Sequence, residues 1–143
     1  MTGSGLSADG AGPAPGGALP KPATTDWHLL VRGALRRLSG SGVDSPRADA
    51  EQLAAHVMGL ETGAALARIL AGAQASADEA ARYGKLVARR VERVPLQHLT
   101  GEAYFHGVCL QVGPGVFLPR PETELLVEHT LAAVAGIDRP VLV

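Results

Sequence analysis

The apolar residues between Thr24 and Val94 recur every three or four positions, which is the spacing of amphipathic helices. This pattern predicts a small bundle of four helices over residues 24–94. A third helix, over residues 64–70, is apolar apart from one arginine, so we expect it in the middle of the bundle. The predicted buried stripes of the other three helices are Trp27, Val31, Leu35, Leu38, Ala50, Leu53, Ala54, Val57, Tyr83, Leu86, Val87 and Val91.

Short polar signals predict where these helices begin. Thr25 or Asp26 can cap the first helix, because a short polar side chain there accepts a hydrogen bond from a free backbone amide. The pair Ser45-Pro46 predicts the second start, with serine as the cap and proline at the first helical position. Ser76 and Glu79 have capping-box spacing, so each side chain can bind the backbone amide of the other residue.

The pattern changes at Pro95, which ends the last helix of the bundle. Alternating apolar residues over 108–112 predict a half-buried strand, and the Gly-Pro-Gly sequence at 113–115 predicts a turn. The apolar run at 116–118 can return as a second strand, so we expect a β-hairpin within a linker of residues 95–120. The side chains that we expect the hairpin to bury are Phe105, Cys109 and Phe117.

A fifth helix is predicted to begin at Pro121. Glu122 and Glu124 occupy its first turn, where negative charge is favoured; two positions apart, they point to different sides, which argues against a catalytic carboxylate pair. Apolar residues occur on both of its faces, so we expect it to be buried against a larger structure. The apolar run at 141–143 then resembles a strand that opens an α/β domain. Because three residues cannot complete a sheet, we expect residues 121–143 to begin a truncated domain.

Composition narrows the classes of function. Residues 1–23 contain six Gly and four Pro without a repeating apolar face, so we expect a disordered Gly/Pro/Ala-rich tail, with a docking arm as the alternative. A net charge of −1 argues against wholesale nucleic-acid binding. The single cysteine cannot form an internal disulfide, which is typical of cytoplasmic proteins. Neither a signal peptide nor an apolar run of roughly 20 residues is present, so we expect a cytoplasmic monomer without a membrane span.

The basic residues of the fourth helix gather toward its C-terminal end, and they are Arg82, Lys85, Arg89, Arg90 and Arg93. We interpret them as a solvated helix face that complements the helix dipole. The alternative is a patch that binds phosphates of ribosomal RNA or an acidic partner protein. The five histidines are scattered without supporting Cys, Asp or Glu, so no metal site is predicted.

Three segments together resemble a known family. They are residues 93–97 (Arg-Val-Pro-Leu-Gln), 101–107 (Gly-Glu-Ala-Tyr-Phe-His-Gly) and 118–125 (Leu-Pro-Arg-Pro-Glu-Thr-Glu-Leu). This series resembles the linker of the release factor glutamine methyltransferases, the HemK or PrmC family. Its members have a helical bundle, a β-hairpin linker and a C-terminal Rossmann-like methyltransferase domain. His98 stands where the family usually has tyrosine, which puts a specific role at that position in doubt.

The resemblance implies a mainly α chain: the N-terminal bundle and linker, then the first helix and first strand of a truncated Rossmann-like domain. It also implies a protein-glutamine N-methyltransferase of translation termination, with S-adenosylmethionine as cofactor and peptide-chain release factors as partners. The family methylates N5 of the glutamine in their Gly-Gly-Gln motif. Its glycine-rich loop and Asn-Pro-Pro-Tyr segment do not occur in these residues. We therefore expect this chain alone to be inactive, and we predict no catalytic residue in it.

Four candidate site residues follow from the resemblance. Arg120, Pro121 and Thr123 are candidates for the wall of the cofactor pocket, and Phe105 is a candidate for substrate binding. The flanking prolines confine Arg120 to an extended backbone, so its side chain is well aimed. The alternative for Arg120 is structural, in that it joins the linker to the catalytic domain through salt bridges.

Two other functions remain open. One is a non-catalytic helical module that binds a protein partner; a reading frame continuing into Asp-Leu-Gly-x-Gly-x-Gly would exclude it. The other is methylation of a glutamine of ribosomal protein L3. The L3 enzymes typically have a Pro-Arg-Ser-Pro type segment in place of the Pro-Arg-Pro-Glu-Thr-Glu at 119–124, so the residues favour the release factor branch.

Overall fold

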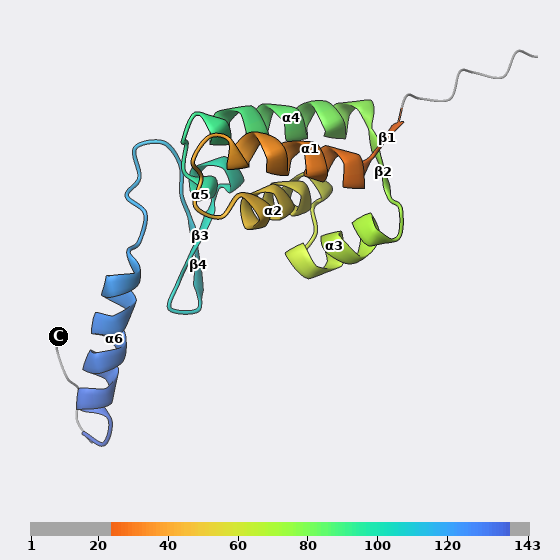
Figure 1. Cartoon of the computed structure of the whole chain (residues 1–143). Coiled ribbons are helices and arrows are strands. Elements are labelled where there is room, and N and C mark those ends of the chain that lie inside the picture. Colours follow the sequence, from red (N-terminus) through yellow and green to blue (C-terminus); the bar gives the residue numbers. More distant parts are fainter. Residues whose placement is uncertain (1–23, 138–143) are drawn as a thin grey trace, which may run out of the picture.

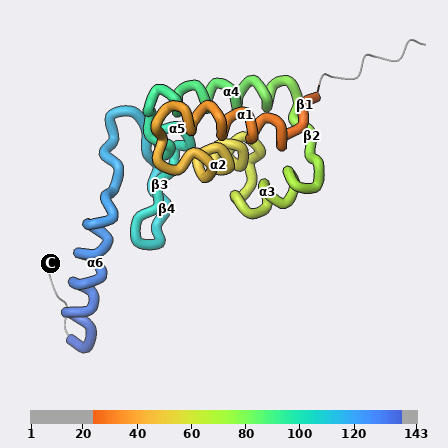
Figure 2. Tube along the Cα trace, in the orientation of Figure 1, coloured from red at the N-terminus to blue at the C-terminus, as the bar shows by residue number. Residues whose placement is uncertain are grey.

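The structure is a computed structural model that describes residues 24–137. A helical bundle is followed by a β-hairpin, a connecting segment and a last helix that stands apart from the bundle (Figures 1 and 2). In chain order the elements are β1 (Thr24–Asp26), α1 (Trp27–Ser39), α2 (Pro46–Met58), α3 (Thr62–Leu70), β2 (Gln74–Ser76), α4 (Ala77–Val91), α5 (Leu96–Thr100), β3 (Glu102–Phe105), β4 (Val108–Gln111) and α6 (Pro121–Val134). The predicted tail at 1–23 and the predicted strand at 141–143 lie outside the described residues. The mainly helical fold class is confirmed.

A short antiparallel ladder joins the beginnings of α1 and α4, and the sequence pattern did not predict it. β1 pairs with β2, with Asp26 opposite Gln74, and the Trp27 amide donates to the Ala73 carbonyl at 3.2 Å. Asp26 and Ser76 are the N-cap residues of α1 and α4. The ladder therefore holds two helix N-termini side by side.

Two of the predicted caps are confirmed and one is wrong. Asp26 accepts a hydrogen bond from the amide two residues later at 2.7 Å. Ser76 and Glu79 form the predicted capping box, with the Glu79 carboxylate 2.8 Å from the Ser76 amide and the Ser76 hydroxyl 3.2 Å from the Glu79 amide. α2 begins at Pro46 as expected, but Ser45 makes no side-chain cap bond. Its ψ of 62° departs from the extended conformation that aims a capping side chain at the helix amides.

The bundle core surrounds two aromatic rings. Trp27 and Tyr83 meet edge to face, with ring centroids 5.4 Å apart, which is a favourable aromatic geometry. The Tyr83 hydroxyl donates to the Ala50 carbonyl at 3.0 Å, so the phenol is satisfied inside the core. Of the predicted stripes, eight side chains are buried: Trp27, Leu38, Ala50, Leu53, Ala54, Val57, Tyr83 and Val87. The other four are half-buried: Val31, Leu35, Leu86 and Val91.

Helix α3 lies at the edge of the bundle, so the prediction that it occupies the middle is wrong (Figure 1). It begins at Thr62, two residues earlier than expected. Only Ala65 and Ile69 are buried, and Leu70 is 83% exposed. Half of its apolar residues are alanines, which lose little by remaining in water because the hydrophobic gain scales with the apolar area removed.

The hairpin uses a different pair of strands from the predicted one. β4 confirms the strand expected near 108–112, but its partner is β3 on the N-terminal side, whereas 116–118 forms no strand. The turn is His106-Gly107, whose φ angles are 45° and 79°. Two consecutive positive φ values are the type I′ geometry, which matches the twist of antiparallel strands. A two-residue turn therefore closes the hairpin in place of the Gly-Pro-Gly turn.

The hairpin buries little, which corrects three side-chain predictions. Phe117 is 97% exposed, Cys109 is exposed, and Phe105 is only half-buried. Ala103, by contrast, is 4% exposed. In the part of the chain that the structure describes, no second layer covers the two strands, so only Ala103, which faces the bundle, is fully buried.

Helix α6 begins at Pro121 with its two acidic residues in the first turn, as predicted. No residue of α6 is buried by the part of the chain that the structure describes, and Leu125, Leu126 and Leu131 are more than half exposed. Its burial against a larger structure therefore stays a prediction. Among the described helices none is by itself long and apolar enough to cross a membrane; α2 and α3 meet the length and composition only as a pair, bent by 91°.

Candidate functional site

The short helix α5 anchors the linker to the bundle. Leu99 belongs to the bundle core and is 7% exposed. The ring nitrogen Nε2 of His98 lies 3.1 Å from the Val116 carbonyl oxygen. A carbonyl only accepts, so this nitrogen carries the proton, and the ring holds the connecting segment against α5. His98 therefore has a structural contact, at the position where the resemblance left its role in doubt.

The first turn of α6 is bound to the turn of the hairpin. The Glu124 carboxylate oxygen Oε1 accepts a hydrogen bond from the His106 amide at 2.8 Å. Glu122 is exposed on the same turn. The two carboxylates therefore have different roles. Both carry negative charge at the start of a helix, where it is favoured, and Glu124 also holds the turn of the hairpin.

The four candidate site residues lie around this junction. Arg120 is the N-cap of α6, and its φ of −99° and ψ of 141° confirm the expected extended backbone; its side chain is exposed. Pro121 is the first helical residue, and the exposed Thr123 donates its amide to the Arg120 carbonyl at 2.9 Å. Phe105 directly precedes the hairpin turn that Glu124 binds. Residues far apart in sequence therefore share one region of the surface.

The chemistry of this region is that of binding and positioning. The Arg120 guanidinium presents planar donors that suit carboxylates, and the Thr123 hydroxyl can donate or accept. Within residues 24–137, no group of three or more His, Cys, Asp and Glu side chains is placed to hold a metal ion.

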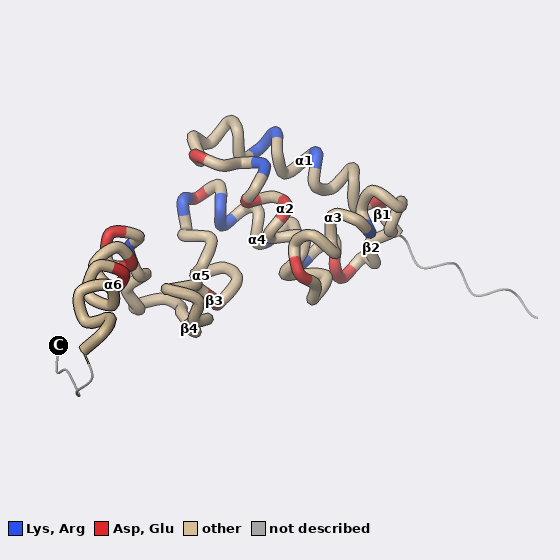
Figure 3. The backbone as a smooth tube through the Cα atoms, turned by 90° about the horizontal axis from the view of Figure 1, so that it is seen from below, with Lys and Arg blue, Asp and Glu red and all other residues tan. Residues whose placement is uncertain are grey.

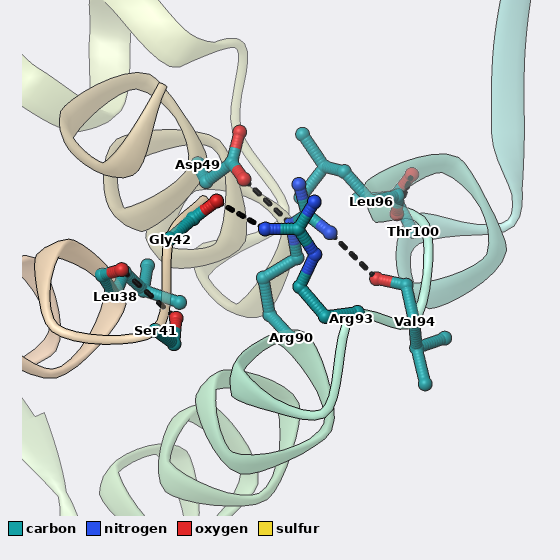
Figure 4. A network of polar contacts seen from close by, with 9 residues as sticks. All are labelled: Leu38, Ser41, Gly42, Asp49, Arg90, Arg93, Val94, Leu96 and Thr100. Atoms are coloured by element: carbon teal, nitrogen blue, oxygen red, sulfur yellow. Dashed lines mark hydrogen bonds and ion pairs between the residues drawn. The ribbon is translucent and has the colours of Figure 1, made fainter. Parts of the chain in front are cut away.

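A polar network fixes the point where the bundle passes into the linker (Figure 4). The Arg90 Nε donates to the Asp49 carboxylate at 2.6 Å, and Arg90 also donates to the Val94 carbonyl at 3.1 Å. The two charged side chains are 16% and 8% exposed. Arg93, two residues beyond the end of α4, donates to the Gly42 carbonyl in the loop before α2. The network ties the end of α4 to α2, to the loop before α2 and to Val94, the residue that precedes the linker.

The predicted basic patch is therefore smaller than expected. Arg90 was predicted to lie on the helix surface, but its charge is neutralised by Asp49 inside the bundle, and Arg93 is bound to a backbone carbonyl. Arg82, Lys85 and Arg89 remain exposed. Lys and Arg positions follow α1 and the C-terminal part of α4 (Figure 3).

Sequence reasoning missed the three contacts that order this region. Asp49 and Arg90 are 41 positions apart, and the His98–Val116 and His106–Glu124 pairs are each separated by 18 positions. No periodicity or cap motif operates over such separations. A buried Asp on an otherwise apolar helix face is the one signal that was available, since a buried carboxylate requires a partner.

Comparison with known proteins gives a consistent answer. The family described as "PrmC N-terminal domain" matches residues 30–101. A release factor glutamine methyltransferase of Streptomyces coelicolor is 50% identical over 108 residues, which are 76% of this chain and 36% of the relative. Proteins of the same name from Mycolicibacterium smegmatis and Deinococcus radiodurans are 45% and 41% identical, covering 76% and 78% of this chain and 37% and 39% of the relatives.

The chain spans a little over a third of the length of these curated relatives. The match covers half of the chain, and it includes the bundle from the first turn of α1, the polar network around Arg90 and the helix α5 that anchors the linker. The resemblance seen in the linker motifs is thus confirmed independently over the bundle. This chain belongs to the PrmC N-terminal domain family.

Proposed function

We propose that this chain supplies the N-terminal domain and linker of an S-adenosylmethionine-dependent enzyme that methylates a protein glutamine. The substrate is the glutamine of the Gly-Gly-Gln motif of peptide-chain release factors, methylated at N5. The observation that carries the proposal is the family match, together with 50% identity to a relative named release factor glutamine methyltransferase. We further propose that the enzyme works as a monomer in the cytoplasm, where it contributes to translation termination.

The linker residues suit the part that we assign to them. S-adenosylmethionine carries a carboxylate and, when bound, supplies an electrophilic methyl group. Arg120 offers an exposed guanidinium on an extended backbone and Thr123 an exposed hydroxyl, so both fit a cofactor with a carboxylate and hydroxyl groups. Phe105 presents part of an aromatic ring next to the hairpin turn. In this arrangement Arg120, Pro121 and Thr123 would form one wall of the cofactor pocket, and Phe105 would contact the substrate.

The role of the bundle and linker is then to position two reactants. Holding the amide nitrogen and the methyl donor in line contributes much of the rate in a transfer reaction. The bonds from Glu124 to the hairpin turn and from His98 to the connecting segment keep this framework in one arrangement. The residues of this chain orient and enclose, and we assign the transfer step to none of them.

A chimeric enzyme tests the proposal. Residues 24–134 of this chain would replace the matching segment of the Streptomyces coelicolor relative, and transfer of a labelled methyl group from S-adenosylmethionine to a release factor would be measured. We expect activity within about tenfold of the parent enzyme, because the residues that frame the pocket are retained. A release factor with alanine in place of the Gly-Gly-Gln glutamine is the matched control and should remain unlabelled.

The outcomes separate the competing functions. A folded chimera that binds S-adenosylmethionine but labels no release factor would refute the proposal. Labelling of ribosomal protein L3 in preference to the release factor would assign the chain to the other glutamine methyltransferase branch. Residues 1–143 alone should show no binding of S-adenosylmethionine by calorimetry, and micromolar binding would contradict our expectation that this chain alone is inactive.

A further inference from the structure

A groove of about 800 Å³ lies between α2 and α3 on one side and α5 and β3 on the other. Its lining is polar and acidic: it includes the carboxylates of Glu61 and Glu102 and the amides of Gln52 and Gln97. All four of these side chains are exposed. His56 also lines the groove, and within residues 24–137 no Lys or Arg does. The groove is separate from the candidate cofactor residues, which follow it in sequence, and the proposed activity does not use it.

Tyr104 gives this groove an aromatic surface. Its side chain is 68% exposed and lines the groove beside Glu102. The Cys109 thiol opposite it on β4, together with Glu61 and Glu102, raises the pKa of the Tyr104 phenol. The two carboxylates contribute to this shift because they place a negative potential around the ring. An exposed aromatic face in a negative field is complementary to a cation, and above all to the flat guanidinium of arginine.

The edge of β3 also faces the groove. Successive residues of a strand point to opposite faces, yet Glu102, Ala103 and Tyr104 all line the groove, whereas no residue of β4 does. These three residues can share one lining only along the strand edge that is turned away from β4. The Val112 amide donates to the Gly101 carbonyl at 2.9 Å, which sets the phase of the ladder.

In that phase the hydrogen-bonded pairs of the hairpin are residues 101/112, 103/110 and 105/108. The backbone groups of Glu102 and Tyr104 then point outward from the hairpin. The Glu102 carbonyl has a weak partner in the Thr100 hydroxyl at 3.5 Å. The Tyr104 amide and carbonyl are directed away from β4. Within residues 24–137 no backbone group pairs with this edge of β3, and an edge of this kind accepts an extended peptide as an additional strand.

We propose that this groove binds an extended, arginine-bearing segment of a partner protein. The segment pairs with the edge of β3 through the backbone of Tyr104, and an arginine side chain stacks on the Tyr104 ring between Glu61 and Glu102. Nucleic acids and anionic membranes are disfavoured as occupants, because two carboxylates repel their phosphates and, among the described residues, no Lys or Arg of the lining offsets them. The proposal does not depend on the proposed methylation.

The test uses isotope-labelled residues 1–143 and the synthetic peptide acetyl-Thr-Arg-Val-Arg-Thr-amide. Amide chemical shifts are followed by NMR at low ionic strength as peptide is added. We expect shifts confined to residues 60–62 and 100–105, with weak affinity. A peptide with citrulline in place of arginine keeps the shape without the charge. We expect its affinity to be lower by about tenfold, since each exposed ion pair contributes up to about fivefold.

Variants of the chain complete the design. Glu61→Gln combined with Glu102→Gln should weaken arginine-peptide binding by about tenfold, and Tyr104→Ala should weaken it further, because the stacking surface is lost. Glu92→Gln removes an exposed carboxylate that does not line the groove, so it should leave the affinity unchanged. Because all four positions are exposed, the circular dichroism spectra should match that of the parent chain.

Three results would overturn the proposal. The first is equal affinity for the arginine and citrulline peptides. The second is a pattern of shifts on α1 or on the basic end of α4 in place of the groove. The third is an absence of shifts at a peptide concentration of about 10 mM, since even a weak edge interaction would be populated there.

Discussion

The ion pair between Asp49 and Arg90 offers the sharpest test of how the bundle holds the linker. Arg90→Met keeps a long unbranched side chain, so the packing of the arginine stem is largely retained while the charge is removed. Asp49 then remains in a site where its side chain is 8% exposed, without its cationic partner. The bond from Arg90 to the Val94 carbonyl is lost as well.

The expected cost follows from the burial of the pair. Removing one partner of a fully buried ion pair costs about 3–5 kcal/mol, because an uncompensated charge is left behind. The Arg90 side chain is 16% exposed, so water can reach the vacated side of Asp49 and reduce that penalty. We expect Arg90→Met to lower the free energy of unfolding by about 2–4 kcal/mol, with a fall in Tm of roughly 10 °C or more for a bundle of this size.

Urea unfolding is the suitable assay, since urea does not screen the ion pair as a guanidinium salt does. Trp27 is the single tryptophan and is 1% exposed in the core, so its fluorescence reports on the bundle. Arg89→Met is the matched control, because Arg89 directly precedes Arg90 and its side chain is exposed. We expect it to change the free energy of unfolding by no more than about 0.5 kcal/mol. Asp49→Ala combined with Arg90→Met removes both charges, and we expect it to be at least about 1 kcal/mol less destabilising than the sum of the single changes.

The reasoning would be refuted by an Arg90→Met protein whose free energy of unfolding lies within about 0.5 kcal/mol of the parent at an unchanged slope against urea. Equal losses for Arg89→Met and Arg90→Met would refute it too, because they would show that general charge, and not the buried contact, decides the stability. Strict additivity in the double variant would show that the two side chains are not coupled.

Three further predictions concern single contacts. The hydrogen bond from the Ser76 amide is the chief cause that lowers the pKa of Glu79 from 4.5, so this cap stabilises the fold at neutral pH and the stabilisation is lost as the pH falls through the lowered pKa. Glu79→Gln should lower the free energy of unfolding by about 1 kcal/mol at pH 7. Urea unfolding of this variant should no longer show the loss of stability at acid pH. Burial raises the pKa of the Tyr83 phenol above its ordinary 10.0, so the stability of the fold is intact below that value and falls as the pH rises past it. Tyr83→Phe should abolish this loss of stability at alkaline pH and lower the free energy of unfolding by about 1 kcal/mol at pH 7. An unchanged dependence of stability on alkaline pH would contradict this. His98→Phe removes the hydrogen bond to the Val116 carbonyl, so amide hydrogen exchange over residues 113–118 should accelerate. The free energy of unfolding of the bundle should change by less than about 0.5 kcal/mol. Slower or equal exchange would count against the anchoring role of His98.

The sequence predicted the backbone of one candidate site residue correctly, but it did not predict how the hairpin of the linker pairs. The Pro-Arg-Pro sequence fixed the backbone of Arg120, because proline restricts both its own φ and the conformation of the preceding residue. The Gly-Pro-Gly sequence at 113–115 forms the predicted turn, in which the Val116 amide donates to the Gly113 carbonyl at 3.0 Å, but the expected strand does not follow it. Two features made β3 the partner of β4: the buried Ala103 anchors β3 to the bundle, and the short turn at His106-Gly107 joins the two strands.

Local sequence determined the elements whose causes are local. The cap at Asp26, the capping box at Ser76 and the start of α6 at Pro121 depend on groups within three or four residues of one another, so they can be derived from spacing alone. The same holds for most of the apolar stripes, because the helical period places them on one face. The mainly helical class follows from these elements.

Tertiary structure alone decided which strand pairs with β4, where α3 lies and which charges are removed from the surface. Those outcomes depend on partners far apart in the chain, such as Asp49 with Arg90 and Glu124 with the turn at His106. Several segments have a similar local propensity to pair with a given strand. The segment that pairs is the one with a face that the bundle can bury. The sequence determined the parts by short-range hydrogen bonding and periodicity, and packing between distant segments determined how the linker is held.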